Sequence, residues 1–319
     1  MDSHTRKKHI FCLGSAAIDC KLKSKQSLVL STSNPAHAVI TYGCVARNVA
    51  HTLANITQQI YLQSVVGHDE GQRMLSYMRD LGVNVDTSLQ LSDQKTAHYY
   101  AILTEAGELH VAMAAMEIYE HIPFAAFTQH WQQWSNDSII FMDTNLSPEI
   151  IEHAIKICKT KNICLCIDPV STIKAKKLPF SLDGVFLLKP DQYEATALTQ
   201  VDIFSPKDCF KAGKILLDRG VKNIVISLGK SGYVILNDKY NQHYPALNVD
   251  HVRDVSGAGD AFIAGILFGL QNDMELSEAC LWGSAAAALT IQTFQTVMTD
   301  LTLADLTNKI DESKYAEIF

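Results

Sequence analysis

Short apolar runs alternate with amphipathic helical segments along most of the chain, and this alternation constrains the fold more than any other feature. Buried parallel strands read as short continuous apolar runs, and connecting helices carry apolar residues every three to four positions. Strands are predicted at 9–14, 60–67, 138–143, 162–168, 184–189, 223–229 and 232–236. Helices are predicted at 46–56, 70–82, 124–134, 148–159, 206–219, 257–270 and 276–291. The pattern therefore predicts an α/β fold with a largely parallel sheet.

A different pattern interrupts this alternation between Lys95 and Ala115. Two strand-like runs, 96–103 and 108–115, flank a turn that contains a glycine, which predicts a β-hairpin. Residues 27–43 could join the hairpin in a small separate sheet. Because open α/β folds bind ligands at the strand ends, we expect this sheet to form a lid there. We expect a single domain over 1–319, with a lid from about 16–45 and 94–116.

The composition excludes several functional classes. A net charge of −7 leaves nothing to offset repulsion by phosphates, so we expect no nucleic-acid partner. The longest apolar run, Ala261–Leu270, is far shorter than the roughly 20 residues of a membrane span, and no signal-peptide pattern is present. Eight cysteines without a C-x-x-C pair are typical of reduced thiols, and no closely spaced histidines suggest a zinc site. We expect a cytoplasmic protein without a membrane partner.

The segment DVSGAGDAFIAGILFGL, residues 254–270, carries the strongest chemical signal. A helix start has unpaired N–H groups and partial positive charge, and Gly257, Ala258 and Gly259 would leave them unshielded for an anion. The segment could equally be a glycine-lined packing surface. Asp260 favours the anion site, because a carboxylate there can accept the proton of a hydroxyl that attacks a phosphoryl group. We expect the helix dipole to lower the pKa of Asp260 and keep it ionised.

Two glycine-rich motifs fail on inspection. GKSG at 229–232 is no P-loop, because the position that needs the first glycine is Ile224, inside a predicted strand. GAGDAF is no dinucleotide fingerprint, because the third glycine position is Phe262.

Two segments, 254–260 and 42–50, resemble the signatures of the ribokinase-like carbohydrate kinases of the PfkB type. The family's Asp-Thr-x-Gly-Ala-Gly-Asp is similar to DVSGAGD, with Val255 in place of threonine and Ser256 as a second hydroxyl. Its early Gly-Gly…Asn signature is similar to YGCVARNVA, with Tyr42 in place of the first glycine. The resemblance covers essentially the whole chain. It implies a ribokinase-like three-layer sandwich, with a mostly parallel central sheet and a small β-sheet lid.

The resemblance also implies roles for individual residues. Asp260 would be the catalytic base, and Gly257, Ala258 and Gly259 the anion hole. Asp19, Gly43 and Asn48 would bind the acceptor. LKPDQYE is similar to the family's Lys-Pro-Asn-x-x-Glu element, with Asp191 in place of asparagine, and ISLGKSG looks like its nucleotide loop. These motifs imply ATP contacts from Lys189, Asp191, Glu194, Ser227, Gly229, Gly232 and Ser256, with Glu194 and Asp191 holding Mg²⁺ through water.

Four stretches are similar to pseudouridine kinases within this family: GCVARN, AMEIYEH, DTNLSPE and, most distinctively, DPVSTIKAKKL at 168–178. Ala115 departs from them, since they often carry an aspartate there. Thr96, Asn145 and Lys174 become candidate nucleoside contacts, although Lys174 could equally be a solvated residue at a helix start.

The implied reaction is the transfer of a phosphoryl group from ATP to the 5′-hydroxyl of pseudouridine, assisted by Mg²⁺. Dependence on a monovalent cation such as K⁺ stays open. Two alternatives also stay open: a kinase for ribose, another sugar or an ordinary nucleoside, and a non-catalytic nucleoside-binding regulator. Because an exposed strand edge promotes association, we expect a homodimer through the lid.

Overall fold

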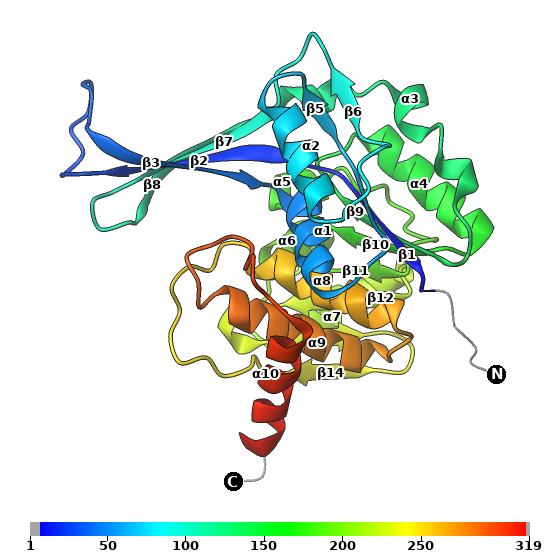
Figure 1. Cartoon of the computed structure of the whole chain (residues 1–319). Coiled ribbons are helices and arrows are strands. Elements are labelled where there is room, and N and C mark those ends of the chain that lie inside the picture. Colours follow the sequence, from blue (N-terminus) through cyan, green and yellow to red (C-terminus); the bar gives the residue numbers. More distant parts are fainter. Residues whose placement is uncertain (1–6, 317–319) are drawn as a thin grey trace.

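The central sheet of the computed structural model, which describes residues 7–316, has eight strands in this part of the chain (Figure 1). In spatial order they are β14 (Asn241–Tyr244), β13 (Tyr233–Leu236), β12 (Asn223–Ser227), β11 (Leu187–Leu188), β10 (Cys164–Asp168), β9 (Ser138–Asp143), β1 (His9–Leu13) and β4 (Ile60–Gln63). The strands from β12 to β4 are parallel, and β13 and β14 add an antiparallel edge. The predicted α/β class with a mostly parallel sheet is confirmed.

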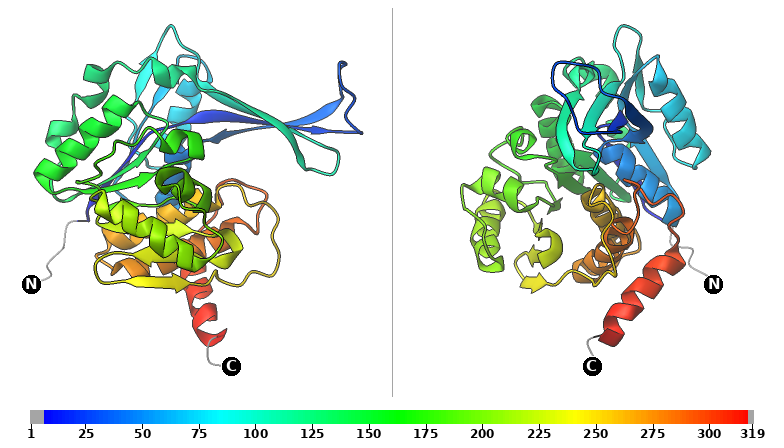
Figure 2. Two further views of the ribbon diagram at one scale, coloured as in Figure 1. Left: turned by 180° about the vertical axis from the view of Figure 1, so that it is seen from behind. Right: turned by 90° about the vertical axis from the view of Figure 1, so that its left-hand side faces the viewer.

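Helices cover both faces of this sheet, so the body has three layers (Figure 2). One face carries α1 (Val45–Ile56), α2 (Glu70–Asp80), α8 (Ala258–Gln271), α9 (Leu276–Thr290) and α10 (Leu303–Ala316). The other carries α3 (Phe124–Thr128), α4 (Pro148–Lys161), α5 (Thr172–Ala175), α6 (Gln192–Thr199) and α7 (Pro206–Asp218). Strand β9 shows why its apolar run is continuous: Phe141 packs into one core, and Ile140 and Met142 pack into the other.

A second sheet of four strands projects from the body (Figures 1 and 2). Its order is β3 (Ala36–Gly43), β2 (Ala17–Ser24), β7 (Ala97–Leu103) and β8 (Leu109–Ala115). The pair β7 and β8 is the predicted hairpin. We call these four strands the projecting sheet. Among the described residues, no helix is both long enough and apolar enough to cross a bilayer.

Several predicted boundaries are wrong. The expected strand 60–67 breaks at Ser64, whose carbonyl accepts from Leu89 N, so that β5 (Val65–Gly67) pairs with β6 (Leu89–Leu91) instead. The expected helix 124–134 divides into α3 and a 3₁₀ turn, η2 (Trp131–Gln133), because Gln63 Nε2 donates to the Phe127 carbonyl that a continuous helix would use. Of 27–43 only β3 is a strand.

Other elements were not predicted. They are β2, β6, β14, α5, α6, α10 and two further 3₁₀ turns, η1 (Glu117–Glu120) and η3 (Gly229–Ser231). Most are short or polar, so a periodicity test has few apolar positions to detect.

Candidate active site

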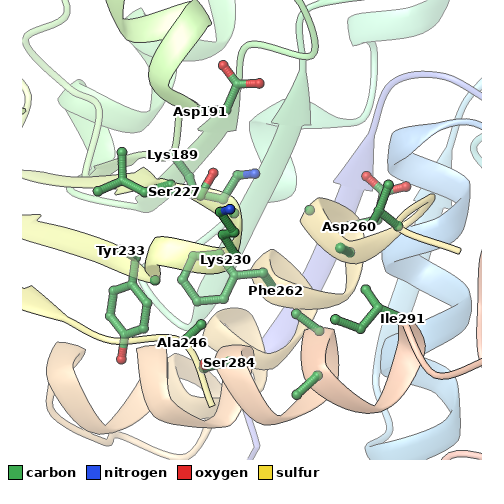
Figure 3. Close-up of a pocket in the computed structure, with 18 of the residues that line it drawn as sticks. Lys189, Asp191, Ser227, Lys230, Tyr233, Ala246, Asp260, Phe262, Ser284 and Ile291 are labelled. Atoms are coloured by element: carbon green, nitrogen blue, oxygen red, sulfur yellow. The ribbon is translucent and has the colours of Figure 1, made fainter. Parts of the chain in front are cut away.

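A cavity of about 770 Å³ opens where β10, β11 and β12 end and α8 begins (Figure 3). Crevices at the carboxyl ends of parallel strands are the usual ligand sites of open α/β sheets. Most of the predicted catalytic and nucleotide residues line this one cavity, namely Ala258, Gly259, Asp260, Lys189, Asp191, Glu194, Ser227, Gly229 and Gly232. Gly257 and Ser256 are not among the lining residues, and Ser256 N donates to Asp254 Oδ1 at 2.8 Å.

The cavity has a charged end and a less polar end. In Figure 3, Lys189, Asp191 and Asp260 lie in the upper part of the view, and Tyr233, Ala246 and Ser284 lie in the lower part. The sequence prediction missed the residues of this less polar end. The available signal was the run of small residues in α9, which leaves room for a ligand beside Phe262 and Tyr233. An apolar slot that leads to charged groups suits a flat aromatic base attached to a phosphate chain.

The N-terminus of α8 leaves backbone donors unpaired next to the cavity. Gly257 has φ 79°, and a Cβ there would lie 1.8 Å from the Thr296 carbonyl oxygen, so only glycine fits. The N–H groups of Gly257, Gly259 and Asp260 have no acceptor within residues 7–316, whereas Ala258 N donates to Val255 O at 3.3 Å. A Cβ on Gly259 would meet only the Lys189 ammonium, at 3.4 Å. The helix start can therefore receive an anion.

Asp260 is held by Asn48, which was expected to bind the acceptor. Asn48 Nδ2 donates to Asp260 Oδ2 at 2.8 Å, across the contact between α1 and α8. Burial raises the pKa of Asp260 to about 7, and the charge of Asp168 adds to this, while the hydrogen bond from Asn48 opposes it. The expectation of a lowered pKa is wrong, because the cost of desolvating the carboxylate exceeds the benefit from the helix start.

A buried ion pair lies beside this carboxylate. Lys189 Nζ lies 2.9 Å from Asp168 Oδ2, and both side chains are almost fully buried. Burial lowers the pKa of Lys189, but the charges of Asp168 and Glu194 outweigh it and the net pKa is raised. Lys189 therefore stays charged next to Gly259. Asp168, which the prediction did not assign to the site, lines the cavity, and its position at the end of a central strand was the available signal.

The predicted metal residues share a capping box at the start of α6. Glu194 N donates to Asp191 Oδ1 at 2.7 Å, and Asp191 N donates to Glu194 Oε2 at 2.8 Å. One oxygen of each carboxylate remains for another partner. Burial, together with the charge of Asp168, raises the pKa of Glu194 to about 8, so a cation there would be favourable.

The described residues contain no group of three or more His, Cys, Asp or Glu side chains arranged to hold a metal ion. The free carboxylate oxygens of Asp191 and Glu194 are the kind of donor that Mg²⁺ takes, and Mg²⁺ bound with a nucleotide takes its other ligands from phosphates and water.

The predicted acceptor residues Asp19 and Gly43 lie together at the base of the projecting sheet. A Cβ on Gly43 would lie 2.1 Å from Asp19 Oδ2, so the absence of a side chain makes room for the carboxylate. Burial raises the pKa of Asp19 to about 6. Of the early signature, Cys44 and not Tyr42 has the backbone conformation that favours glycine, with φ 71°.

Asn145 and Lys174 also meet. Lys174 Nζ donates to Asn145 Oδ1, and Asn145 Nδ2 donates to Ser15 Oγ at 2.8 Å. The charges of both Lys174 and Asp19 act on the Cys44 thiol, whose pKa rises to about 12 mainly through burial. Asn145 and Lys174 therefore border the same region of the structure as Asp19 and Gly43.

Thr96 directly precedes β7, whose first residue, Ala97, pairs with Ala17 of β2, two positions before Asp19. Its hydroxyl donates to Asp69 Oδ1 and accepts from Gly67 N at 3.0 Å, so it connects the start of β7 to β5 and to the start of α2.

The three-layer fold and the cavity at its strand ends are typical of α/β enzymes that act on small molecules. The chain belongs to the pfkB family of carbohydrate kinases, whose family model matches residues 7–301. It is a sugar or nucleoside kinase, and kinases of this family use ATP.

Three relatives show the extent of the similarity. Pseudouridine kinase of Escherichia coli is 28% identical over 309 residues, which are 97% of this chain and 98% of that protein. A carbohydrate kinase from Agrobacterium tumefaciens is 26% identical with a TM-score of 0.80, covering 95% of this chain and 97% of its own. The Arabidopsis thaliana ribokinase structure, a complex with ribose and ATP, has a TM-score of 0.83 at 18% identity, covering 95% and 99% of the two chains.

Proposed function

We propose that this protein phosphorylates the 5′-hydroxyl of pseudouridine with ATP, giving pseudouridine 5′-phosphate and ADP. The observation that carries the proposal is the position of Asp260, a part-buried carboxylate at the open N-terminus of α8 and at the charged end of a cavity large enough for a nucleotide. The full-length similarity to a pseudouridine kinase supports the choice of acceptor.

In this proposal ATP occupies the cavity. Its base lies at the end formed by Tyr233, Phe262 and α9, and its phosphates extend toward Lys189. Ser227, Gly229 and Gly232 border the nucleotide between these ends. The unpaired N–H groups at Gly259 and Asp260 and the Lys189 ammonium stabilise the charge that develops on the transferred phosphoryl group.

The acceptor lies on the other side of Asp260, near Asp19, Gly43 and Asn48. Asp260 accepts the proton of the 5′-hydroxyl and orients its oxygen toward the phosphorus. Asn145 and Lys174 are the proposed contacts for the base, because they border the same region as Asp19. Mg²⁺, held by Glu194 and Asp191 through water, would neutralise the phosphate charge, and K⁺ dependence is a matter for assay.

An acceptor panel tests the proposal. Purified protein, with ATP and Mg²⁺, is assayed with pseudouridine, uridine, ribose and fructose, and kcat/KM is compared. We expect pseudouridine to exceed every other acceptor by at least about tenfold, which corresponds to a discrimination of roughly 1.4 kcal/mol. A preference for uridine or ribose would overturn the choice of acceptor. The absence of turnover with the whole panel, with ATP still bound, would favour a nucleoside-binding regulator.

We also propose a homodimer formed through the projecting sheet. Ile40, Tyr100, Met113 and Val111 share one face of this sheet by strand register, and all four are exposed. On the opposite face Lys21 pairs with Asp254 at 3.3 Å, next to the start of α8. The face with Ile40 and Met113 is thus free for a second copy, whereas Lys21 connects the opposite face to the start of α8. The eight cysteines are free, in agreement with the proposed cytoplasmic location.

A further inference from the structure

Arg47 is a buried cation that the proposed reaction does not use directly. Its side chain lies in α1, one residue before Asn48, and the residue is 3% exposed. Within residues 7–316 it forms no ion pair with a carboxylate. Buried arginines are rare unless a partner or a function retains them. The contacts of the Arg47 guanidinium show which neighbouring groups it keeps in place.

Three polar partners and two rings fix the guanidinium. Nη1 donates to the Tyr42 carbonyl at 2.9 Å and to Asn48 Oδ1 at 3.0 Å. Nη2 lies 2.7 Å from His51 Nδ1. The rings of Tyr42 and Tyr77 lie 5.9 and 5.8 Å from the guanidinium carbon.

These contacts determine how the Asn48 amide points. A guanidinium has only donors, so the group of Asn48 that faces Arg47 has to be the acceptor, Oδ1. The amino group Nδ2 must then face the other way, and there it donates to Asp260 Oδ2. A reversed amide would place Oδ1 against the carboxylate and leave both without a donor. Arg47 therefore selects the orientation in which Asn48 supports an ionised Asp260.

We infer that Arg47 is a positioning residue, which acts on the proposed base Asp260 by fixing the orientation of the Asn48 amide. The inference rests on the proposed function, since it assigns the role through that base. It adds a residue to the site that touches neither nucleotide nor acceptor.

The charges around Asp260 come from several elements. Asp168 and Asp143, at the ends of β10 and β9, favour its protonated form, and Lys189, at the end of β11, favours the ionised form. From α1, Asn48 donates directly to the carboxylate and Arg47 lies behind it. If the Asn48 amide is no longer held in this orientation, Asp260 loses a hydrogen bond that favours its ionised form.

His51 completes the arrangement. Its Nδ1 accepts from Arg47, so the ring has to be neutral, and burial lowers its pKa to about 3. Arg47 Nε and His51 Nε2 are buried without a hydrogen-bond partner. Such unpaired groups cost stability, and their retention suits a network that serves the site.

The test compares Arg47→Met with a matched control, Arg219→Met. Arg219 likewise has three hydrogen-bond partners, all of them backbone carbonyls, and lies over a ring, that of Phe180. It follows α7, on the face of the sheet opposite to α8. Turnover with pseudouridine is measured from pH 5.5 to 9, and folding is followed by circular dichroism and thermal denaturation. We expect R47M to lower kcat by about tenfold or more. We also expect it to shift the acidic limb of the kcat/KM profile to higher pH, by about half a pH unit or more. We expect R219M to leave that limb in place.

A double-mutant comparison gives the decisive result. With Asn48→Ala, the amide is gone, and adding R47M should lower kcat little further. Equal effects of R47M with and without Asn48 would overturn the inference, as would an unshifted acidic limb in folded R47M. If R47M does not fold, Arg47→Lys replaces it, because lysine keeps the charge but cannot hold the three partners together.

Failure of the proposed function has a different signature. If Asp260→Asn retains full turnover, the proposed base is wrong whatever R47M does. If D260N is inactive and R47M has a normal pH profile, only the inference about Arg47 fails.

Discussion

Asp260, the proposed base, shows how its surroundings can adjust a single residue for proton transfer. Burial raises its pKa to about 7, close to neutral pH. A general base is most effective when its pKa lies near that pH, because it is then sufficiently ionised and still basic. Asn48, from a helix more than two hundred positions away in sequence, supplies the donor that keeps the ionised form accessible.

The first prediction concerns Asp260→Asn. We expect kcat to fall by about 10² to 10⁴, because the variant cannot accept the proton, while ATP still binds in the cavity. In the wild-type enzyme kcat/KM should fall as the pH drops below about 7, since the base becomes protonated. Steady-state assays from pH 5.5 to 9, with calorimetric titration of ATP into D260N, provide the measurement. Equal turnover by the variant and wild type would contradict the assigned role.

At the scale of elements, apolar periodicity predicts the parallel strands, since β9 and β10 are buried on both faces. The resemblance of the motifs to those of the carbohydrate kinases also places Lys189, Ser227 and Asp260 in one site. In the structure all three line one cavity, where strand ends and the start of α8 meet at one edge of the sheet. What could not be predicted depends on pairs distant in sequence. Examples are the turn of the chain at Ser64 toward Leu89, and the hydrogen bond from Asn48 to Asp260.

Two glycines at the start of α8, Gly257 and Gly259, give a prediction in which each variant serves as the control for the other. Gly257→Ala places a side chain 1.8 Å from the Thr296 carbonyl in a left-handed conformation, so we expect about 1–3 kcal/mol of destabilisation. Gly259→Ala meets only the flexible end of Lys189, at 3.4 Å, so its fold should remain intact. Turnover should still fall in G259A, because the methyl group shields the unpaired N–H groups. Denaturant titration and assays of both variants measure these effects, and a stable, fully active G257A would contradict the geometry.

The projecting sheet connects the element scale to the whole molecule. One of its faces leaves Ile40 and Met113 exposed at 65% and 70%, which is unusual for a monomer with a well-packed body.

We therefore expect wild-type protein to elute as a dimer in size-exclusion chromatography with light scattering. Ile40→Glu combined with Met113→Glu should give monomers, because charges would face each other across the interface. Phe204→Glu is the control, since Phe204 is 90% exposed and lies between α6 and α7, outside the four strands of the projecting sheet. Monomeric wild type, or a dimer that survives both glutamates, would show that this face does not pair copies.

For the molecule as a whole, three carboxyl groups with raised pKa values predict how stability depends on pH. Asp19, Asp260 and Glu194 have pKa values of about 6, 7 and 8 in the folded protein. In the unfolded chain such groups titrate near pH 4, so between about pH 4 and 8 the unfolded state binds fewer protons than the folded state. These groups therefore make the ligand-free protein less stable as the pH rises through that window.

The last prediction follows from this proton balance. In the ligand-free protein, Glu194→Gln should raise the melting temperature at pH 8.5 by about 2 °C or more, because the neutral amide removes the cost of burying a charge. At pH 5 the same substitution should have little effect, since the carboxyl group is already protonated there. Glu152→Gln, on the exposed side of α4, is the control and should show no such pH dependence. Differential scanning calorimetry at both pH values measures the effect. A destabilised E194Q at pH 8.5 would show instead that the attraction between the ionised Glu194 and Lys189 contributes more than the burial of the charge costs.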